Sequence, residues 1–180
     1  IDGYYGLTPL HIATKNNNKE IVELLLEYGA EPYGGLLHTA AEYNSTDVAI
    51  LLIEKGVDVN SRGELSTNPL HTAAYHNSVD VAKILIDNGV CLDAGDYFCG
   101  CHRSGNTPLH YAVWGNSVET AELIIDSGAD INRTNYGEDQ EDTPLYTAVK
   151  CDKKEIFDLL VKKGAHTTDY PLHYAVYSEK

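Results

Sequence analysis

The chain has 180 residues, and its 13 Lys and Arg against 27 Asp and Glu give a formal net charge of −14. An acidic surface repels a phosphate backbone, so we expect neither a nucleic acid nor an anionic membrane as partner. No apolar stretch approaches the ~20 residues of a membrane span, so we expect no membrane insertion. The favoured partner is a protein with a neutral or basic surface, although the acidity also serves solubility by itself.

A short phrase centred on Leu and His and closed by Ala recurs along the sequence. The interval from the Leu of the phrase to the Gly that closes its unit is always 19 positions: Leu10 to Gly29, Leu37 to Gly56, Leu70 to Gly89, Leu109 to Gly128 and Leu145 to Gly164. A sixth phrase follows at Leu172. The links between units vary in length. A fixed unit with variable links predicts a repeat array in which each unit contacts its neighbours.

Each unit is predicted to open with a short helix. In the first unit Thr8 can cap this helix, and Pro9 occupies the first helical position, where a missing N–H costs nothing. The helix should stop near Asn17, because Asn tolerates a left-handed backbone better than most residues with a Cβ. The equivalent stops in the later units are Asn44, Asn77, Asn116 and Asp152.

A second helix should follow each stop. In the second, third and fourth units a Ser stands at its start, and an acid in its first turn suits the positive end of the helix. These residues are Ser45 and Asp47, Ser78 and Asp80, and Ser117 and Glu119. Neither helix is long enough to be stable alone, so apolar positions such as Val81 and Leu85 must be covered by the neighbouring pairs.

This order of elements resembles the ankyrin repeat, whose pattern is T-P-L-H-x-A, a helix, a turn, a longer helix and a closing L-L-x-x-G-A followed by D-x-N. Residues 107–112 carry the opening phrase, and residues 52–60 and 124–132 match the closing half with aliphatic replacements. The sequence departs from the pattern at the helix stops, which are Asn or Asp instead of Gly, and at Leu36, Asn68 and Tyr146. The 19-residue interval survives these departures.

The resemblance implies an all-α repeat solenoid of helix-turn-helix units joined by β-hairpin or loop fingers, in which the His of each phrase is structural and hydrogen bonds with the Thr. It covers nearly the whole chain, which we expect to form one monomeric domain over residues 1–180. The five full units and the partial sixth are expected at about 6–35, 36–65, 66–104, 105–140, 141–169 and 170–180. Both ends fall within a unit, so we expect the segment to belong to a longer protein.

Binding in this family generally uses the concave surface made by the first helices and the fingers. The positions five and six after the repeated Leu are rich in aromatic residues in the middle units, and aromatic anchors within a polar rim are typical of binding hot spots. The candidate partner-binding residues are Tyr43, Tyr75, His76, Tyr111, Trp114, Tyr97, Phe98 and Lys150. In the alternative interpretation, Tyr111 packs as ordinary core and Trp114 covers a neighbour's methylene groups.

The link between the third and fourth units is enlarged and contains Cys91, Cys99, Cys101 and His102. Three thiols and an imidazole could supply the four ligands of a zinc ion, but Cys99 and Cys101 are closer together than structural zinc sites usually place them. Reduced thiols are the default in the cytoplasm, with zinc or a disulfide as alternatives. We therefore expect no metal and no cofactor, and we interpret Tyr97 and Phe98 as a finger that reaches a partner.

Another enlarged link holds the acidic run 138–142, which indicates a solvated loop or a docking point for a basic segment. Catalysis finds little support, because the recurring His residues belong to the fold and no phosphate-binding Gly-rich loop follows a strand. We predict a protein–protein interaction scaffold, not an enzyme, in the cytoplasm or shared between cytoplasm and nucleus.

Two alternatives remain open. The chain could be a regulatory or targeting segment of a larger enzyme, channel or host-directed effector whose activity lies outside these residues, or the Cys-rich link could act as a metal- or redox-responsive switch. The composition, rich in Asn, Ile, Tyr and Lys, loosely resembles ankyrin proteins of large DNA viruses and intracellular bacteria that engage host proteins.

Overall fold

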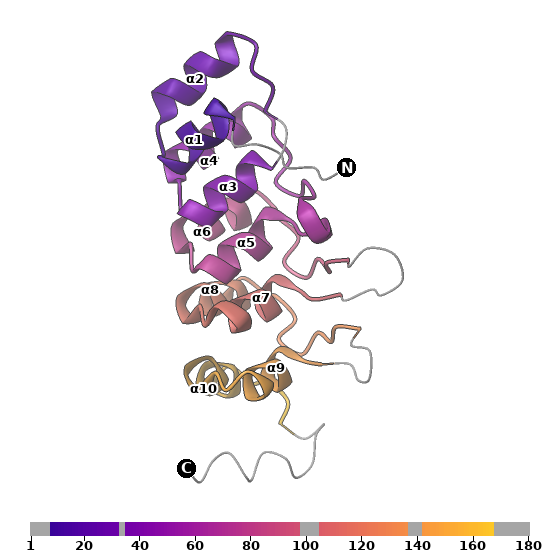
Figure 1. Ribbon diagram of the computed structural model, residues 1–180. Helices are drawn as coiled ribbons and strands as arrows, with labels where there is room; N and C mark the ends of the chain where they lie inside the picture. Colours follow the sequence, from indigo (N-terminus) through magenta and orange to yellow (C-terminus); the bar gives the residue numbers. More distant parts are fainter. Residues whose placement is uncertain (1–7, 33–34, 98–104, 137–141, 168–180) are drawn as a thin grey trace.

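The computed structural model describes residues 8–32, 35–97, 105–136 and 142–167 (Figure 1). These residues form ten α-helices in five consecutive pairs. The first helices of the pairs are α1 (Pro9–Lys15), α3 (Leu36–Tyr43), α5 (Pro69–His76), α7 (Pro108–Gly115) and α9 (Pro144–Lys150). The second helices are α2 (Lys19–Glu27), α4 (Thr46–Glu54), α6 (Val79–Asp87), α8 (Val118–Asp126) and α10 (Lys154–Lys162).

The pairs stack in chain order, so that the first helices form one layer and the second helices form another (Figure 1). Each first helix packs on the first helix of the next pair, and each second helix does the same. The links between pairs project from one edge of the array, and the turns within the pairs lie at the opposite edge. This confirms the predicted all-helical repeat array.

Left-handed residues make the turn within every pair, as the sequence predicted. Asn17, Asn44, Asn77, Asn116 and Asp152 all have φ between 50° and 55°. The backbone N–H of the residue after each of the four Asn stops donates to a carbonyl inside the first helix, as Ser45 N does to Ala40 O at 2.8 Å. Short polar side chains tolerate this conformation better than other residues with a Cβ, which explains why the stops fall here.

The Asn stops also join each pair to the next. Asn44 Nδ2 donates to Asp80 Oδ2 at 3.0 Å, and Asn44 Oδ1 accepts from Val81 N at 3.1 Å. Each of the four Asn stops reaches the carboxylate in the first turn of the next second helix in this way, and three of them also accept a backbone N–H there. The carboxylate residues are Asp47, Asp80, Glu119 and Glu155.

This bridge changes the role expected of the serines that begin the second helices. Ser45, Ser78 and Ser117 are the N-cap residues of α4, α6 and α8, but none of their side chains caps its own helix. The Asn stop of the previous unit already accepts the N–H that a cap would take, as Asn17 Oδ1 does from Val48 N in α4. Two of these hydroxyls donate backward instead, from Ser45 to Lys15 O at 3.4 Å and from Ser117 to Tyr75 O at 3.2 Å.

A single apolar core runs through the stack. Its members are the repeated Leu and Ala of the first helices and the inward positions of the second helices. The largest fully buried side chains are Leu36, Leu37, Leu51, Leu52, Leu70, Leu85, Leu109, Ile124, Leu145, Ile156, Leu160 and His71. Among the described residues, no helix has the length and apolar character needed to cross a membrane.

The described parts of the links contain no strand, so of the two finger forms expected the structure shows loops, with a short 3-10 helix (η1, Glu64–Ser66) in the second link. In the third link the Asp96 N–H donates to Asn106 O, and the Asp96 carbonyl accepts from Gly105 N, both at 3.1 Å. In the second link Leu65 and Ser66 both have a left-handed φ of 56°. Beside the short first link lies a hollow of about 340 Å³ lined by residues such as Pro32, His38 and Arg62.

Candidate partner-binding surface

Exposed aromatic side chains gather on consecutive first helices. Tyr43 at the end of α3 is 43% exposed, Tyr75 near the end of α5 is 46% exposed, and His76 beside it is also exposed. The rings of Tyr75 and His76 meet edge-on, with centroids 5.1 Å apart. Trp114 on α7 is half-buried. We call these four residues the aromatic patch.

Trp114 is less exposed than the sequence suggested, because its ring leans on Tyr111 one turn earlier, with centroids 5.0 Å apart. The next residue, Gly115, explains the close fit of α7 against α5. A Cβ at Gly115 would clash with the carbonyl oxygen of Tyr75, so the missing side chain lets the two helix ends approach. One side of the Trp114 indole therefore packs against Tyr111, and part of the indole surface remains exposed to solvent.

Tyr111 is a half-buried member of the packing, as the alternative interpretation of the sequence had it. Its ring meets the buried His71 ring edge-on at 5.0 Å, and its hydroxyl donates to Asp96 Oδ2 at 2.9 Å. Burial, followed by the nearby Asp96 carboxylate, raises the pKa of the Tyr111 hydroxyl, so it stays protonated and acts as a donor. Tyr111 thus connects the aromatic patch to the third link through Asp96.

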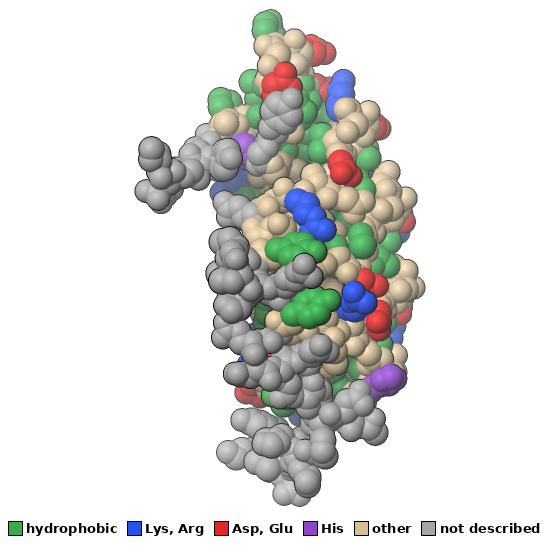
Figure 2. All heavy atoms as spheres, turned by 90° about the vertical axis from the view of Figure 1, so that its right-hand side faces the viewer, with side chains coloured by type: hydrophobic (Ala, Val, Ile, Leu, Met, Phe, Trp, Pro, Cys, Tyr) green, Lys and Arg blue, Asp and Glu red, His purple; other side chains and the backbone are tan. Residues whose placement is uncertain are grey.

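Tyr97 follows Asp96 on the edge that carries the links, and it is 49% exposed. Its backbone N–H donates to Leu65 O at 2.8 Å, and the guanidinium of Arg62 lies over its ring, 5.6 Å from the centroid. Figure 2 shows this edge, where hydrophobic side chains lie at mid-height beside side chains of Lys or Arg. Phe98, the other residue expected at this finger, lies outside the described residues.

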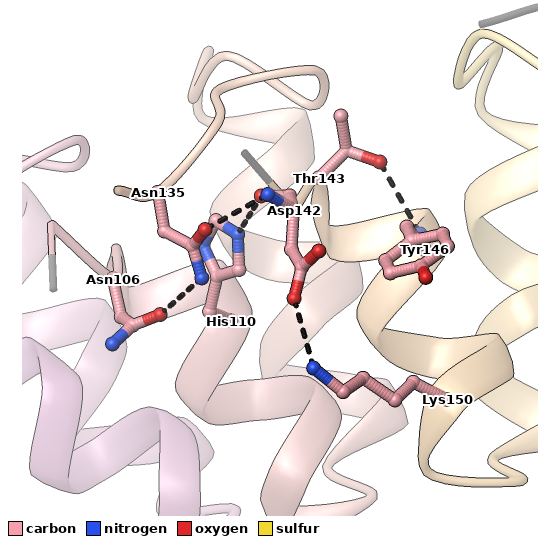
Figure 3. Close-up of polar contacts among 7 residues, drawn as sticks. All are labelled: Asn106, His110, Asn135, Asp142, Thr143, Tyr146 and Lys150. Atoms are coloured by element: carbon pink, nitrogen blue, oxygen red, sulfur yellow. Dashed lines mark hydrogen bonds and ion pairs between the residues drawn. The ribbon is translucent and has the colours of Figure 1, made fainter. Parts of the chain in front are cut away.

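Lys150 is held by the chain itself. Its Nζ lies 3.3 Å from Asp142 Oδ2, and the lysine side chain is 66% exposed against 12% for the aspartate (Figure 3). Asp142 closes the acidic run 138–142, and of this run only Asp142 is described. That residue is buried, which differs from the solvated loop expected, because its backbone N–H donates to Asn135 Oδ1 and its carbonyl lies 3.0 Å from His110 Nε2. Lys150 therefore lies beside the aromatic patch as part of an ion pair with Asp142.

The recurring His residues form a column that joins neighbouring units. His71 Nε2 lies 3.1 Å from Asn106 O, so it must carry the proton, and Nδ1 then accepts from Asn68 N at 3.1 Å. His110 makes the same pair of contacts, with Asp142 O (Figure 3) and with the backbone N–H of Thr107. Desolvation lowers the pKa of both imidazoles to about 4, so both are neutral near pH 7.

The family's expected bond between this His and the Thr of the phrase is present in His11 with Thr8, at 2.7 Å, and in His110 with Thr107, at 2.9 Å. His38 is different because Gly35 stands where the capping residue would be. Its Nε2 reaches Thr67 O at 3.0 Å, but its buried Nδ1 has no hydrogen-bond partner among the described residues.

The metal ligands considered from the sequence are mostly outside the described residues. Cys99, Cys101 and His102 belong to that part, and Cys91 is exposed at the start of the third link. The backbone N–H of Cys91 donates to Asn60 Oδ1 at 2.8 Å. In the described part of the chain, no three His, Cys, Asp or Glu side chains lie where they could hold a metal ion together.

Sequence reasoning missed the acidic row at the turn edge, which we define as Asp47, Asp80, Glu119 and Glu155. All four are exposed, and each is oriented by the Asn stop of the preceding unit. Their repeated position in the first helical turn was visible in the sequence. The contact of each carboxylate with an Asn that is 30 to 42 residues away was not visible there.

A family model described as ankyrin repeats in three copies matches residues 1–63 and 37–135. Helices α9 and α10 lie beyond the matched residues, and they repeat the same pair geometry. Repeats of this kind are generally protein–protein interaction modules and are typically not catalytic. Because the match spans 135 of the 180 residues and the helix pairs follow the same pattern, the chain belongs to the ankyrin repeat family.

Proposed function

We propose that this chain is a binding module that holds one partner protein on the aromatic patch, with the third link as a second point of contact. The observation that supports this most is that fully or partly exposed aromatic side chains occupy the last two positions of α3, α5 and α7. Rings of this size supply a large rigid contact area at little entropic cost. A monomer in the cytoplasm, or shared with the nucleus, is part of the same proposal.

The surroundings of the patch also favour a protein ligand. Lys15 Nζ lies over the Tyr43 ring, 4.6 Å from its centroid, and the ion pair of Lys150 with Asp142 flanks the other end. The patch therefore has an aromatic centre and a charged rim, which is the usual arrangement of interface hot spots. Arg62 of the second link and Tyr97 of the third link, whose side chains stack, offer the same kinds of side chain.

The test is to capture a partner on the immobilised protein and then to titrate that partner against variants. We expect Tyr75→Ala and Trp114→Ala each to weaken binding about thirtyfold, the equivalent of about 2 kcal/mol for truncation at the centre of an interface. Tyr75→Ala is the more specific test of binding. Trp114→Ala also removes the packing of Trp114 on Tyr111, so that variant should lose some stability.

The matched control is Tyr28→Ala, because Tyr28 is 85% exposed but follows α2 in the other layer. It should bind like the parent. Circular dichroism and thermal melting establish that the Tyr75 variant is folded. If Tyr75→Ala and Trp114→Ala both bind like the parent, the aromatic patch is not the site.

A further inference from the structure

Resting on the proposed function, we infer that the aromatic patch and the acidic row together take a basic amphipathic helix of the partner, with Lys or Arg recurring every seventh residue beside an apolar stripe. The aromatic patch and the acidic row run side by side along the turn edge. Asn44 directly follows Tyr43 and binds Asp80, and Asn77 directly follows His76 and binds Glu119. The second, third and fourth units therefore each present at least one aromatic residue of the patch and one carboxylate of the row.

The acids of this row are available to an incoming cation. Within the described residues, none of the four carboxylates forms an ion pair with a Lys or Arg. The Asn amide that binds each carboxylate limits its rotation, so less side-chain entropy is lost when a partner binds. Hydrogen bonds from its own backbone and from Asn77 lower the pKa of Glu119, which keeps that side chain ionised.

The spacing of the row selects the form of the partner. Packed helices lie about 8–10 Å apart, so successive units present a carboxylate roughly every 10 Å. A helix rises about 1.5 Å per residue, so residues seven apart lie on one face at about 10 Å. A β-strand needs about three residues for that distance, and residues three apart point to opposite faces. A helix can therefore present a basic stripe to the acidic row and an apolar stripe to the aromatic patch at the same time.

Net charge supports the same occupant. The chain carries −14, so a basic segment is attracted over long range as well as at the row itself. Lys15, over Tyr43, and Lys150, paired with Asp142, lie in the first and fifth units. The middle of the surface, next to Asp80 and Glu119, is where the basic stripe should make its strongest contacts.

The experiment uses two helical peptides of about 21 residues, which is three sevenfold repeats at ~10 Å each. One carries Lys every seventh residue beside a Leu and Phe stripe. The other has the same composition and length, with its Lys positions distributed around the helix. Both are titrated against the parent by fluorescence anisotropy at two salt concentrations. We expect the periodic peptide to bind more tightly, with an affinity that falls as salt is raised.

Two double variants then test whether the salt-dependent part of peptide binding comes from the acidic row or from the net charge of the chain. Asp80→Asn with Glu119→Gln removes two charges of the row but leaves a carbonyl to accept the Asn amide. Glu54→Gln with Asp87→Asn removes the same charge at exposed positions near the ends of α4 and α6. The first pair should weaken the periodic peptide about three- to tenfold, mostly through the association rate, and the second pair should not.

Equal binding of the two peptides to the parent, no binding of either, or equal affinities in the two charge variants would overturn the inference. Failure of the proposed function is distinguished by Tyr75→Ala. If that variant loses the captured partner while the row substitutions change neither the partner nor the peptide, the aromatic site stands and the basic helix does not.

Discussion

Asn77 and Thr120 are 43 positions apart, yet Asn77 Oδ1 accepts both the backbone N–H of Thr120, at 3.2 Å, and its hydroxyl, at 3.0 Å. The same Asn ends α5 with a φ of 55° and donates through Nδ2 to Glu119 Oε2 at 2.8 Å. One side chain therefore makes the turn in the third unit and anchors the first turn of α8 in the fourth.

Replacing this residue separates the two roles. Asn77→Gly keeps an easy left-handed backbone but removes every contact with α8, so we expect a loss of about 1–3 kcal/mol in the free energy of unfolding. Asn77→Ala should lose about 1–2 kcal/mol more, because its Cβ is strained in this conformation. Urea titration followed by circular dichroism measures both.

The control for that pair is Asn88→Ala. Asn88 is exposed at the end of α6, and its amide donates to Ile84 O within its own helix, at 2.8 Å. Its loss should stay within about 0.5 kcal/mol. A glycine variant of Asn77 as stable as the parent would mean that the bridge to α8 adds nothing.

Gly115→Ala should destabilise the protein even though Ala favours a helix over Gly by about 1 kcal/mol. The new Cβ would clash with the carbonyl oxygen of Tyr75, a backbone atom that cannot rotate away, so α7 must move from α5. We expect a net loss of about 1–3 kcal/mol in thermal or urea unfolding. Cys151→Ala, at the equivalent position of the fifth unit, should be close to neutral, and a stabilised Gly115→Ala would refute the close approach.

Leu85→Ala should cost about 2–5 kcal/mol, because Leu85 is 0% exposed in the centre of the stack and its truncation leaves a cavity. In an array held by neighbour contacts, this loss should also uncouple unfolding of the two ends. Ile50→Ala on α4 is the control, since Ile50 is 41% exposed and its loss should stay well below that range. A cost of less than about 1 kcal/mol at Leu85 would contradict its placement.

Stability should fall as the pH drops from about 6.5 toward 4. The pKa values of His71 and His110 are lowered to about 4 in the folded chain, so between these limits the unfolded chain binds protons that the folded chain does not. Each imidazole then contributes a slope of about 1.4 kcal/mol per pH unit. Burial raises the pKa of Asp93, which gives that residue an opposing slope.

Urea titrations between pH 7 and 5 measure this slope, and NMR of the two imidazoles shows whether they stay neutral. Above pH 7 both states are neutral at these residues, so the contribution should vanish there. A flat profile between pH 6.5 and 5, or protonation of either ring in the folded chain near pH 6, would contradict the buried column.

The sequence alone determined the repeat and the local structure of each unit. The constant interval, Pro9 at a helix start and Asn at each stop act within a few residues of the chain, so the helix bounds and the left-handed turns could be predicted. The same local rules place aromatic residues such as Tyr75 on an exposed face.

Only the tertiary structure decided which residues of different units meet. Several features depend on how closely one helix pair approaches the next. They are the contact of Asn77 with α8, the burial of Asp142, the packing of Trp114 on Tyr111 and the acidic row. That approach is set by side chains 30 or more positions apart, such as the missing Cβ of Gly115 against the Tyr75 carbonyl. Periodicity fixes which face a residue occupies, but packing across units fixes what it touches there.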